Sequence, residues 1–387
     1  MRKDQKMNRF YPVCEPDLNG NELKYLTQCI NTGWISSEGE FVKRFESGMA
    51  NLSEKKFGVS VSSGSAALDI ALQVLDLQPG DEVIMPAFTI IACAASILRA
   101  KALPVLVDSE PDHWNMNIHQ IEEIITSKTK AIMAVHTYGL PVDMDPILAL
   151  AKKYKLHVIE DAAEAHGLMY KGRPCGSFGD ISIFSFYANK HITTGEGGMV
   201  LTNNKEWADK ACELRNHCFQ PQKRFLHNEL GYSLRMSNLQ AAVGVAQLEK
   251  LHQTIERKRK IASWYNQHLK PAGADIQLPL AETEYAANSY WVYGILLKSK
   301  ILTNDLVMKI LAENKIATRP FFWPMHCQPV FQRQHIFQNQ HFPVAEYLGS
   351  QGLYLPMSFN LTEDDVAHIA KKVIVAIESA KNAATNY

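Results

Sequence analysis

The chain has 387 residues, a length that suits two or three domains or one large domain with a smaller companion. Hydrophobic residues make up 46% and charged residues 21%, and 40 basic side chains balance 40 acidic ones. Nucleic acid and anionic membranes are therefore not expected as partners, and any bound anion must be held by a local site.

Short apolar runs between residues 58 and 202 predict β-strands, because their continuous β-branched character suggests burial on both faces. They are residues 82–86, 103–108, 130–136, 156–161, 181–186 and 197–202. Between them, the isoleucines of 118–125 share one helical face and residues 145–154 form another amphipathic helix. Alternating strands and helices predict a mostly parallel sheet that binds ligands beyond the carboxyl ends of its strands.

The pattern changes after about residue 245. Residues 248–269 predict one long charged helix, a plausible connector between two domains. Beyond it, a strand over 289–298, a helix over 303–314 and a terminal helix over 362–381 predict a smaller α+β domain. We therefore divide the chain into a large domain (1–245) and a connector helix with a small domain (246–387). About the first 30 residues are expected to pack toward the small domain.

The seven cysteines are odd in number and include no CxxC pair, so neither a disulfide framework nor a metal site is predicted. The charged N-terminal stretch MRKDQKMNRF lacks the apolar run of a signal peptide. The longest uncharged run, residues 83–98, is too short for a membrane span of about 20 residues. We expect a soluble, cytoplasmic protein without a membrane partner.

A serine-rich and glycine-containing segment, SSGSAALDIAL (62–72), leads into a helical pattern. Backbone N–H groups at a helix start, among small residues that permit close approach, suit a phosphate. Ordinary helix capping by Ser62 or Ser63 would explain the same residues.

Three further residues stand at or just beyond the ends of predicted strands. Asp161 ends one strand, and a carboxylate buried there needs a partner such as a protonated ring nitrogen or a capping amide. Ser185 ends the next strand, where its hydroxyl could bind a phosphate oxygen or be a satisfied core group. Lys190 lies between an apolar run and a segment rich in threonine and glycine, an atypical setting for a solvated lysine. A lysine held as the neutral amine traps carbonyl groups as Schiff bases.

Together these features describe one ligand, with an aldehyde for Lys190, a basic ring nitrogen for Asp161 and a phosphate for Ser185 and the helix start. Pyridoxal 5′-phosphate (PLP) has all three groups, and a lysine Schiff base with an acidic partner for the ring nitrogen is its usual binding chemistry. The order of these residues along the chain gives a specificity that no single motif has. The sequence therefore predicts a PLP enzyme with Lys190 and Asp161 as catalytic residues.

The chain resembles the nucleotide-sugar aminotransferases of the DegT family, within the fold-type I PLP-dependent superfamily, over nearly its whole length. The segments that carry the resemblance include TGWISSEGEFVKRFE, SSGSAAL, GDEVIMPAFT, VIEDAAEAHG, GDISIFSFYANKHITTGEGGMV and YSLRMSNLQAAVGVAQLE. The resemblance implies an α/β fold in which a mostly parallel, seven-stranded sheet lies between helices, followed by a smaller α+β C-terminal domain.

The resemblance also implies roles around the cofactor ring. Lys190 would hold PLP covalently as a Schiff base and then shuttle protons, and Asp161 would pair with the ring nitrogen. Glu164 would lie near the ring hydroxyl, where many relatives have glutamine. Phe88 would stack on the ring.

A second group of residues would hold the cofactor phosphate. By the same resemblance, Gly64, Ser65 and Ser185 would bind it from one subunit, and Asn238 would reach it from a partner subunit. The active site would then be shared within a homodimer, or a higher oligomer.

The implied reaction is amino transfer in two stages. L-Glutamate donates its amino group and leaves as 2-oxoglutarate, and a keto-sugar nucleotide then accepts the amino group. The expected acceptor is a GDP-linked 4-keto-6-deoxyhexose, a precursor type for O-antigen and other lipopolysaccharide sugars. Candidate substrate residues, chosen for aromatic or cationic character, are Arg224, His227, Arg319, Phe322, Trp323 and His326. The segment RPFFWP (319–324) could equally pack the two domains together.

Several different activities remain compatible with these residues. The acceptor could be a UDP- or dTDP-linked sugar aminated at carbon 3 or 4. Sugar 3-dehydratases of similar fold have histidine in place of the Schiff-base lysine, whereas this chain has Lys190 followed by His191. A lyase or racemase acting on amino acids would need a carboxylate-binding arginine, a role that Arg319 could fill. A ligand sensor without enzymatic activity has no DNA-binding module or basic patch to support it.

Overall fold

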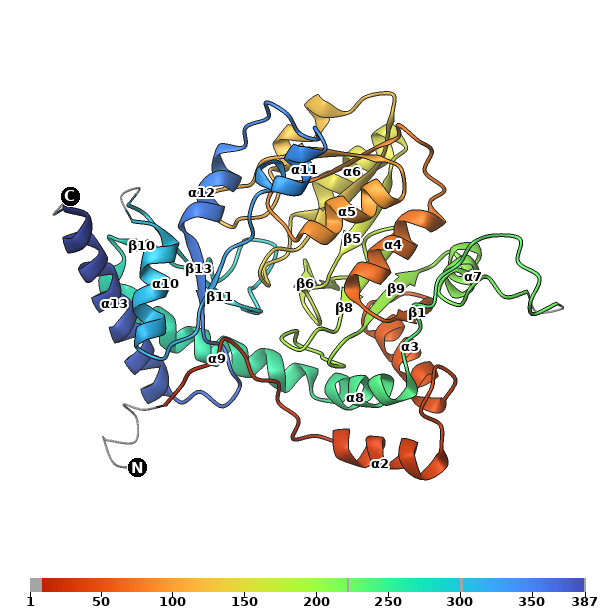
Figure 1. The fold of residues 1–387 in the computed structure, drawn as a ribbon, viewed down its shortest axis with the longest axis horizontal. Helices are drawn as coiled ribbons and strands as arrows, with labels where there is room; N and C mark the ends of the chain where they lie inside the picture. Colours follow the sequence, from red (N-terminus) through yellow and green to blue (C-terminus); the bar gives the residue numbers. More distant parts are fainter. Residues whose placement is uncertain (1–8, 221–222, 300–301, 386–387) are drawn as a thin grey trace.

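A seven-stranded sheet with the order β1-β9-β8-β5-β4-β2-β3 forms the centre of the large domain (Figure 1). The computed structural model describes residues 9–220, 223–299 and 302–385. The strands are β1 (Phe57–Val61), β2 (Glu82–Pro86), β3 (Leu103–Val107), β4 (Thr129–Val135), β5 (His157–Asp161), β8 (Ile181–Ser185) and β9 (Gly198–Thr202). Only β9 runs opposite to the others in this sheet, which confirms the predicted mostly parallel architecture.

The six predicted strands all form, within one residue of the expected bounds at each end. The strand of this sheet that was not predicted is β1, whose sequence FGVSV interrupts its apolar residues with glycine and serine. Residues 118–125 are a correction, because they form two short 3₁₀ turns, Ile118–Gln120 and Glu122–Ile124, in place of an amphipathic helix. Isoleucine at 118, 121 and 124 repeats every three residues, the period of a 3₁₀ turn.

Helices cover both faces of this sheet, and the sheet separates two hydrophobic cores. The helices of the large domain are α2 (Glu22–Thr32), α3 (Glu40–Leu52), α4 (Gly64–Val74), α5 (Ile91–Arg99), α6 (Met144–Tyr154), α7 (Lys205–Leu214) and α8 (Asn238–Glu249). Side chains of α4, α5 and α7 join Val83 and Met85 in one core, whereas α3, α6 and α8 join Ile84 in the other. Successive residues of β2 therefore point to opposite faces, as strand geometry requires.

The small domain is built on a four-stranded antiparallel sheet with the order β10-β11-β13-β12. Its elements are α9 (Leu251–Leu269), β10 (Ile276–Gln277), β11 (Tyr293–Leu297), α10 (Asn304–Glu313), β12 (Arg319–Pro320), α11 (Pro329–Arg333), α12 (Pro343–Gln351), β13 (Gly352–Leu355) and α13 (Glu363–Thr385). A third core unites this sheet with α9, α10 and α13. No helix within the described ranges has both the length and the apolarity needed to cross a bilayer.

The connection between the two domains differs in detail from the expected single helix. Helix α8 ends at Glu249 and α9 begins at Leu251, so the first residues of the predicted helix belong to α8. The boundary drawn at residue 245 falls inside α8 and stays a prediction. Near the N-terminus, Tyr11 pairs with Ile316 and enters the small-domain core, whereas α2 packs against α8 (Figure 1).

Candidate active site

A cavity of about 330 Å³ lies at the carboxyl ends of β5 and β8, next to the start of α4. Seven of the predicted site residues line it: Gly64, Ser65, Asp161, Glu164, Ser185, Lys190 and Phe322. The parallel strands bring together residues that lie about 125 positions apart in the chain, as expected for the strand ends of such a sheet. The cavity is therefore the candidate active site.

The phosphate end of the candidate site is the start of α4. Ser63 is the N-cap, and its hydroxyl accepts a hydrogen bond from the Ala66 N–H at 3.1 Å, so a capping role is present as well. A Cβ atom at Gly64 would lie only 2.6 Å from the Ser185 Cβ, so glycine is what lets Ser185 approach the helix start. The first N–H groups of a helix have no intrahelical acceptors. Together with the Ser65 and Ser185 hydroxyls they make a suitable phosphate cradle.

Lys190 follows β8 in a tight turn, in which its N–H donates to the Tyr187 carbonyl at 2.9 Å. Its side chain is only 9% exposed, and its Nζ lies 3.4 Å from Glu164 Oε1 and 3.6 Å from the centre of the Trp291 ring. Burial lowers the pKa of the Lys190 amine, and the carboxylates of Glu164 and Asp161 partly oppose this shift. A lysine with a lowered pKa is more readily the neutral nucleophile that carbonyl chemistry requires.

Two buried carboxyl groups face this part of the cavity. Asp161 Oδ1 accepts the Ala163 N–H at 3.0 Å, and Oδ2 lies 3.4 Å from the Cys93 thiol. Burial raises the pKa of Asp161, while these hydrogen bonds and Lys190 lower it. Glu164 Oε2 accepts the Tyr138 N–H at 2.8 Å. Burial raises the pKa of Glu164 to about 7, with Lys190 acting in the opposite direction.

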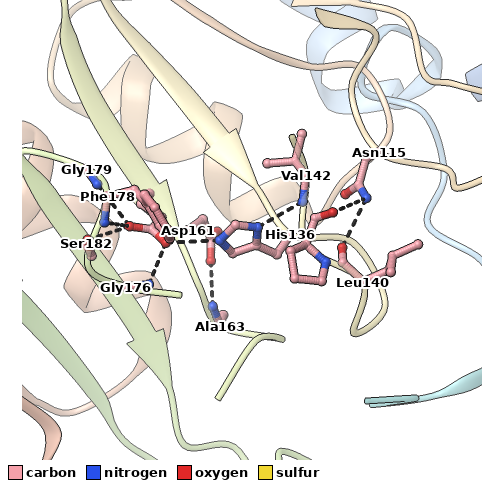
Figure 2. Close-up of polar contacts among 12 residues, drawn as sticks. Asn115, His136, Leu140, Val142, Asp161, Ala163, Gly176, Phe178, Gly179 and Ser182 are labelled. Carbon is pink, nitrogen blue, oxygen red and sulfur yellow. Dashed lines mark hydrogen bonds and ion pairs between the residues drawn. The ribbon is translucent and has the colours of Figure 1, made fainter. Parts of the chain in front are cut away.

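A hydrogen-bonded network around His136, drawn in Figure 2, lies in the core at the ends of β4 and β5. The His136 Nδ1 accepts the Val142 N–H at 3.1 Å, so the proton on the ring is on Nε2, 3.1 Å from Glu160 Oε1. The backbone N–H of His136 donates to the Asp161 carbonyl at 3.2 Å. The network therefore holds the backbone of Asp161 in place at the end of β5.

The ligand atoms of His136, Glu160 and Cys175 lie within 4.8 Å of one another, close enough for a metal ion. Glu160, however, already accepts hydrogen bonds from the N–H groups of Gly176, Phe178 and Gly179 and from the Ser182 hydroxyl. A fully buried carboxylate with this many donors is satisfied without a cation. We therefore interpret the cluster as part of the core.

Phe88 is a correction to the sequence analysis. Its side chain is 0% exposed and packs edge-on against Tyr138, with ring centres 5.8 Å apart, so it is not available to stack on a ring in the cavity. The next two residues, Thr89 and Ile90, line the cavity instead. The chain bends over residues 87–89 after β2 ends, so the Phe88 side chain enters the core while both residues that follow it face the cavity.

Asn238 is a second correction. Its Oδ1 accepts the N–H groups of Phe41 and Val42, and its Nδ2 donates to the Trp34 carbonyl at 2.7 Å. Both ends of the amide are therefore occupied within the same chain, and the side chain is buried. Asn238 holds the segment between α2 and α3 on the start of α8, so we no longer assign it to a partner's phosphate site.

Most of the residues proposed for the nucleotide and sugar lie outside the cavity; Phe322 is the exception. His326 is buried and bonded to Glu346 at 2.8 Å, and the Trp323 indole N–H donates to the Cys327 carbonyl at 3.1 Å. Arg319, in β12, is exposed. The structure thus gives the segment 319–324 a packing role and also places one of its aromatic residues at the cavity.

The two candidates for the sugar lie in the segment after α7. Arg224 borders a separate surface hollow of about 580 Å³ that Trp34 and Arg235 also line. His227 is exposed, with Nδ1 2.7 Å from the His217 carbonyl. Neither residue lines the cavity within this chain, so the substrate roles of Arg224 and His227 stay predictions.

Sequence reasoning missed several cavity residues, among them Ile90, Tyr187, Asn189, Glu196, Trp291 and Tyr354. Tyr187 and Asn189 are neighbours of Lys190 in the sequence, so proximity to that lysine was an available signal. Trp291 and Tyr354 come from the small domain, far away in the chain. The Trp291 indole N–H donates to the Asn189 carbonyl at 2.9 Å, and this contact joins the small domain to the residue that precedes Lys190.

The raised pKa of Glu164 makes the stability of the cofactor-free protein pH-dependent. The pKa rises from 4.5 to about 7 on folding, so the favourable protonated form is lost as pH increases through this range. Between roughly pH 5 and 8, the wild type is expected to lose up to about 3 kcal/mol of unfolding free energy relative to Glu164→Gln. Denaturant unfolding of both apoproteins at the two pH values measures this. A difference between them that does not change with pH would contradict the assignment.

Comparison with known proteins identifies the family of this chain. A profile of the DegT/DnrJ/EryC1/StrS aminotransferase family matches residues 16–374. The chain belongs to this family. It is a PLP-dependent aminotransferase, and the cavity residues fit the cofactor by offering an amine, a carboxylate and a helix start with hydroxyl groups.

The names of two curated relatives refer to different nucleotide sugars. The chain is 40% identical to the GDP-perosamine synthase of Escherichia coli O157:H7, over 94% of this chain and 98% of that protein. It is 41% identical to the UDP-N-acetyl-3-dehydro-α-D-glucosamine 3-aminotransferase of Acidithiobacillus ferrooxidans, over 87% of this chain and 90% of the other.

A similar solved structure comes from Streptococcus pneumoniae. The putative sugar aminotransferase Spr1654, in its PMP-form, aligns with a TM-score of 0.91 and 26% identity, covering 97% of this chain and 100% of the other. The PLP-form of the same protein aligns with a TM-score of 0.89. The fold of this chain is therefore that of the PLP-dependent sugar aminotransferases.

Proposed function

We propose that this aminotransferase moves the amino group of L-glutamate to a GDP-linked 4-keto-6-deoxyhexose and forms GDP-perosamine or a close analogue. The 40% identity to a GDP-perosamine synthase over nearly the whole of both chains supports this acceptor. The single observation that carries the chemistry is the buried Lys190 amine between Glu164 and Trp291, at the end of the cavity that Asp161 also lines.

Each residue has a defined task in this proposal. The start of α4 and the Ser185 hydroxyl would hold the cofactor phosphate, and the Asp161 carboxylate would pair with the ring nitrogen. Lys190 would hold the aldehyde covalently and, once released, would take a proton from the α-carbon of glutamate in the first stage and deliver one to the sugar carbon that receives nitrogen in the second. PLP, when bound, supplies the electron sink for this chemistry. The aromatic walls, Trp291 and Phe322, exclude water from the lysine.

The test is a substrate panel. The purified protein, loaded with PLP, is incubated with L-glutamate and GDP-, UDP- and dTDP-linked keto-sugars, and the products are identified by mass spectrometry and NMR. We expect 2-oxoglutarate and a 4-amino sugar nucleotide, with the GDP-linked acceptor converted fastest. Preferred amination of a UDP-linked 3-keto-sugar would instead favour the second candidate, which the 41% identity to a UDP-sugar 3-aminotransferase supports.

The same substrate panel distinguishes amino transfer from dehydration, from amino-acid chemistry and from ligand sensing. A deoxygenated sugar without nitrogen would indicate a dehydratase. Racemised amino acid, or ammonia without an aminated sugar, would indicate an amino-acid racemase or lyase. Binding without turnover of any substrate would favour a ligand sensor.

We also propose that the enzyme works as a homodimer or a higher oligomer. Leu23 and Ile30 lie seven positions apart on α2, hence on one helix face, and are 78% and 63% exposed. Trp34, just beyond the helix, is 57% exposed. Exposed apolar residues gathered in this way are typical of a protein interface. We call Leu23, Ile30 and Trp34 the α2 surface. We assign a second copy of the chain as its partner.

Trp34→Glu tests this assignment, because it places a charge on the α2 surface. We expect the dimer dissociation constant to rise at least about 30-fold, the effect of losing one large aromatic anchor. Sedimentation velocity over a concentration series measures the change. Val375→Glu, at an exposed apolar position on α13, is the matched control. A variant Trp34→Glu that stays as dimeric as the control would contradict the proposed interface.

We further propose that the enzyme acts in the cytoplasm and supplies activated amino sugars for polysaccharides such as O-antigen. All seven cysteines lie in the described residues and are free thiols, which suits a reducing compartment. A glycosyltransferase receives such an amino sugar in the form of a sugar nucleotide.

A further inference from the structure

A buried thiol that does not line the cavity contacts the Asp161 carboxylate. Cys93, the third residue of α5, places its Sγ 3.4 Å from Asp161 Oδ2. The Thr89 hydroxyl, which belongs to a residue lining the cavity, lies 3.6 Å from the same sulfur. Thr89, Cys93 and Asp161 therefore form a chain of polar contacts along one wall of the site.

The short contact between the Cys93 sulfur and Asp161 Oδ2 is a hydrogen bond that the protonated thiol donates. Cys93 is completely buried, and burial beside Asp161 raises the pKa of its thiol well above the ordinary value. The thiol therefore stays protonated and can donate its S–H to the carboxylate, whereas a thiolate would repel it.

The two oxygens of Asp161 are each held by one donor. The Ala163 N–H binds Oδ1 and the Cys93 S–H contacts Oδ2, so the carboxylate plane cannot rotate without losing a contact. A carboxylate has about four acceptor positions, which leaves room for a further donor from the cavity. The two contacts also offset part of the cost of burying the charge.

We propose that Cys93 is a positioning residue that orients the Asp161 carboxylate and keeps it anionic for the ring nitrogen of the cofactor. This inference rests on the proposed role of Asp161. It assigns Cys93 no contact with substrate or cofactor, and it differs from a packing role because it requires a hydrogen-bond donor at this position.

The first test compares Cys93→Ala, which removes the donor, with Cys93→Ser, which keeps one. The dissociation constant of PLP from the apoprotein is measured by fluorescence titration. We expect it to rise ~3–10-fold in Cys93→Ala, the effect of one lost hydrogen bond to a buried acceptor, and to change by less than about 3-fold in Cys93→Ser. Cys218→Ala, another buried cysteine, away from the cavity, controls for the loss of buried volume.

The second test needs no cofactor and no activity. The S–H stretching band of Cys93 is isolated as the infrared difference between the wild-type apoprotein and Cys93→Ala. We expect a band shifted to lower frequency by the hydrogen bond, which moves back toward higher frequency in Asp161→Asn because a neutral amide is a weaker acceptor. A purely structural cysteine would not respond to this change in charge.

The outcomes separate this inference from the proposed function. If the wild type binds no PLP, the proposed function fails, and the infrared band still decides whether the thiol donates to Asp161. If the wild type binds PLP and Cys93→Ala binds it equally tightly, the positioning role is overturned. An S–H band that is the same in the wild type and Asp161→Asn would overturn it as well.

Discussion

Lys190→Ala is expected to abolish turnover and the absorbance of covalently bound PLP at the same time. Proton transfer by a positioned group contributes about 10²–10⁴-fold to rate, and the covalent role of Lys190 adds to this, so the loss is expected to reach or exceed that range. Steady-state assays with glutamate and the acceptor chosen from the panel measure turnover, and a visible spectrum of the PLP-loaded protein measures the adduct.

The structural background of this prediction is the burial of Lys190. Its amine is held within 3.4 Å of Glu164 and over the Trp291 ring, and both contacts disappear in the alanine variant. Lys205→Ala, which removes an exposed lysine paired with Asp209 on α7, is the matched control and is expected to leave rate and spectrum unchanged. Turnover and an adduct that persist in Lys190→Ala would remove this lysine from the mechanism.

Asp161→Asn is expected to lower kcat by about 10²–10³-fold while some PLP stays bound. The range is that of a lost preorganised electrostatic partner in a buried site. The amide has nearly the same shape as the carboxylate, but it is neutral and no longer favours a proton on the ring nitrogen, so the ring withdraws electrons poorly. Single-turnover kinetics with glutamate, together with the PLP dissociation constant, separate the loss of rate from the loss of binding.

The stability of the apoprotein distinguishes this loss from misfolding. Burial raises the pKa of Asp161, so the carboxylate is costly in the empty site and its replacement by a neutral amide is not expected to lower the melting temperature. Asp145→Asn, at an exposed position paired with Lys171, is the matched control. A rate for Asp161→Asn within a few-fold of the wild type would contradict the pairing with the ring nitrogen.

The sequence was enough to predict six strands of the large sheet and to select Asp161, Ser185 and Lys190, which line one cavity, because both predictions depend on local patterns. Continuous apolar runs with β-branched residues marked the six strands, and chemically unusual residues at their ends marked Asp161, Ser185 and Lys190. β1 was missed because glycine and serine interrupt its apolar pattern, and 118–125 was mistaken for a helix because isoleucines three positions apart suit an α-helix as well as a 3₁₀ turn.

The walls of the site could not be predicted in the same way. Trp291 and Tyr354 reach the cavity only because the small domain packs against the large one, and no local pattern encodes that contact. The prediction that Phe88 stacks on the cofactor ring was wrong because a motif places a residue near the site but does not give the direction of its side chain. The phosphate role predicted for Asn238 did not anticipate its hydrogen-bond partners, which lie about 200 positions earlier in the chain, just after α2 and at the start of α3.

Borohydride reduction followed by peptide mapping tests the central claim most directly. The PLP-loaded protein is reduced, digested and analysed by mass spectrometry to locate the stable pyridoxyl group. We expect a single modified peptide that contains Lys190, with the modification abolished when L-glutamate is added before reduction. A pyridoxyl group on another lysine, or a protein that borohydride leaves unlabelled after loading, would contradict the account.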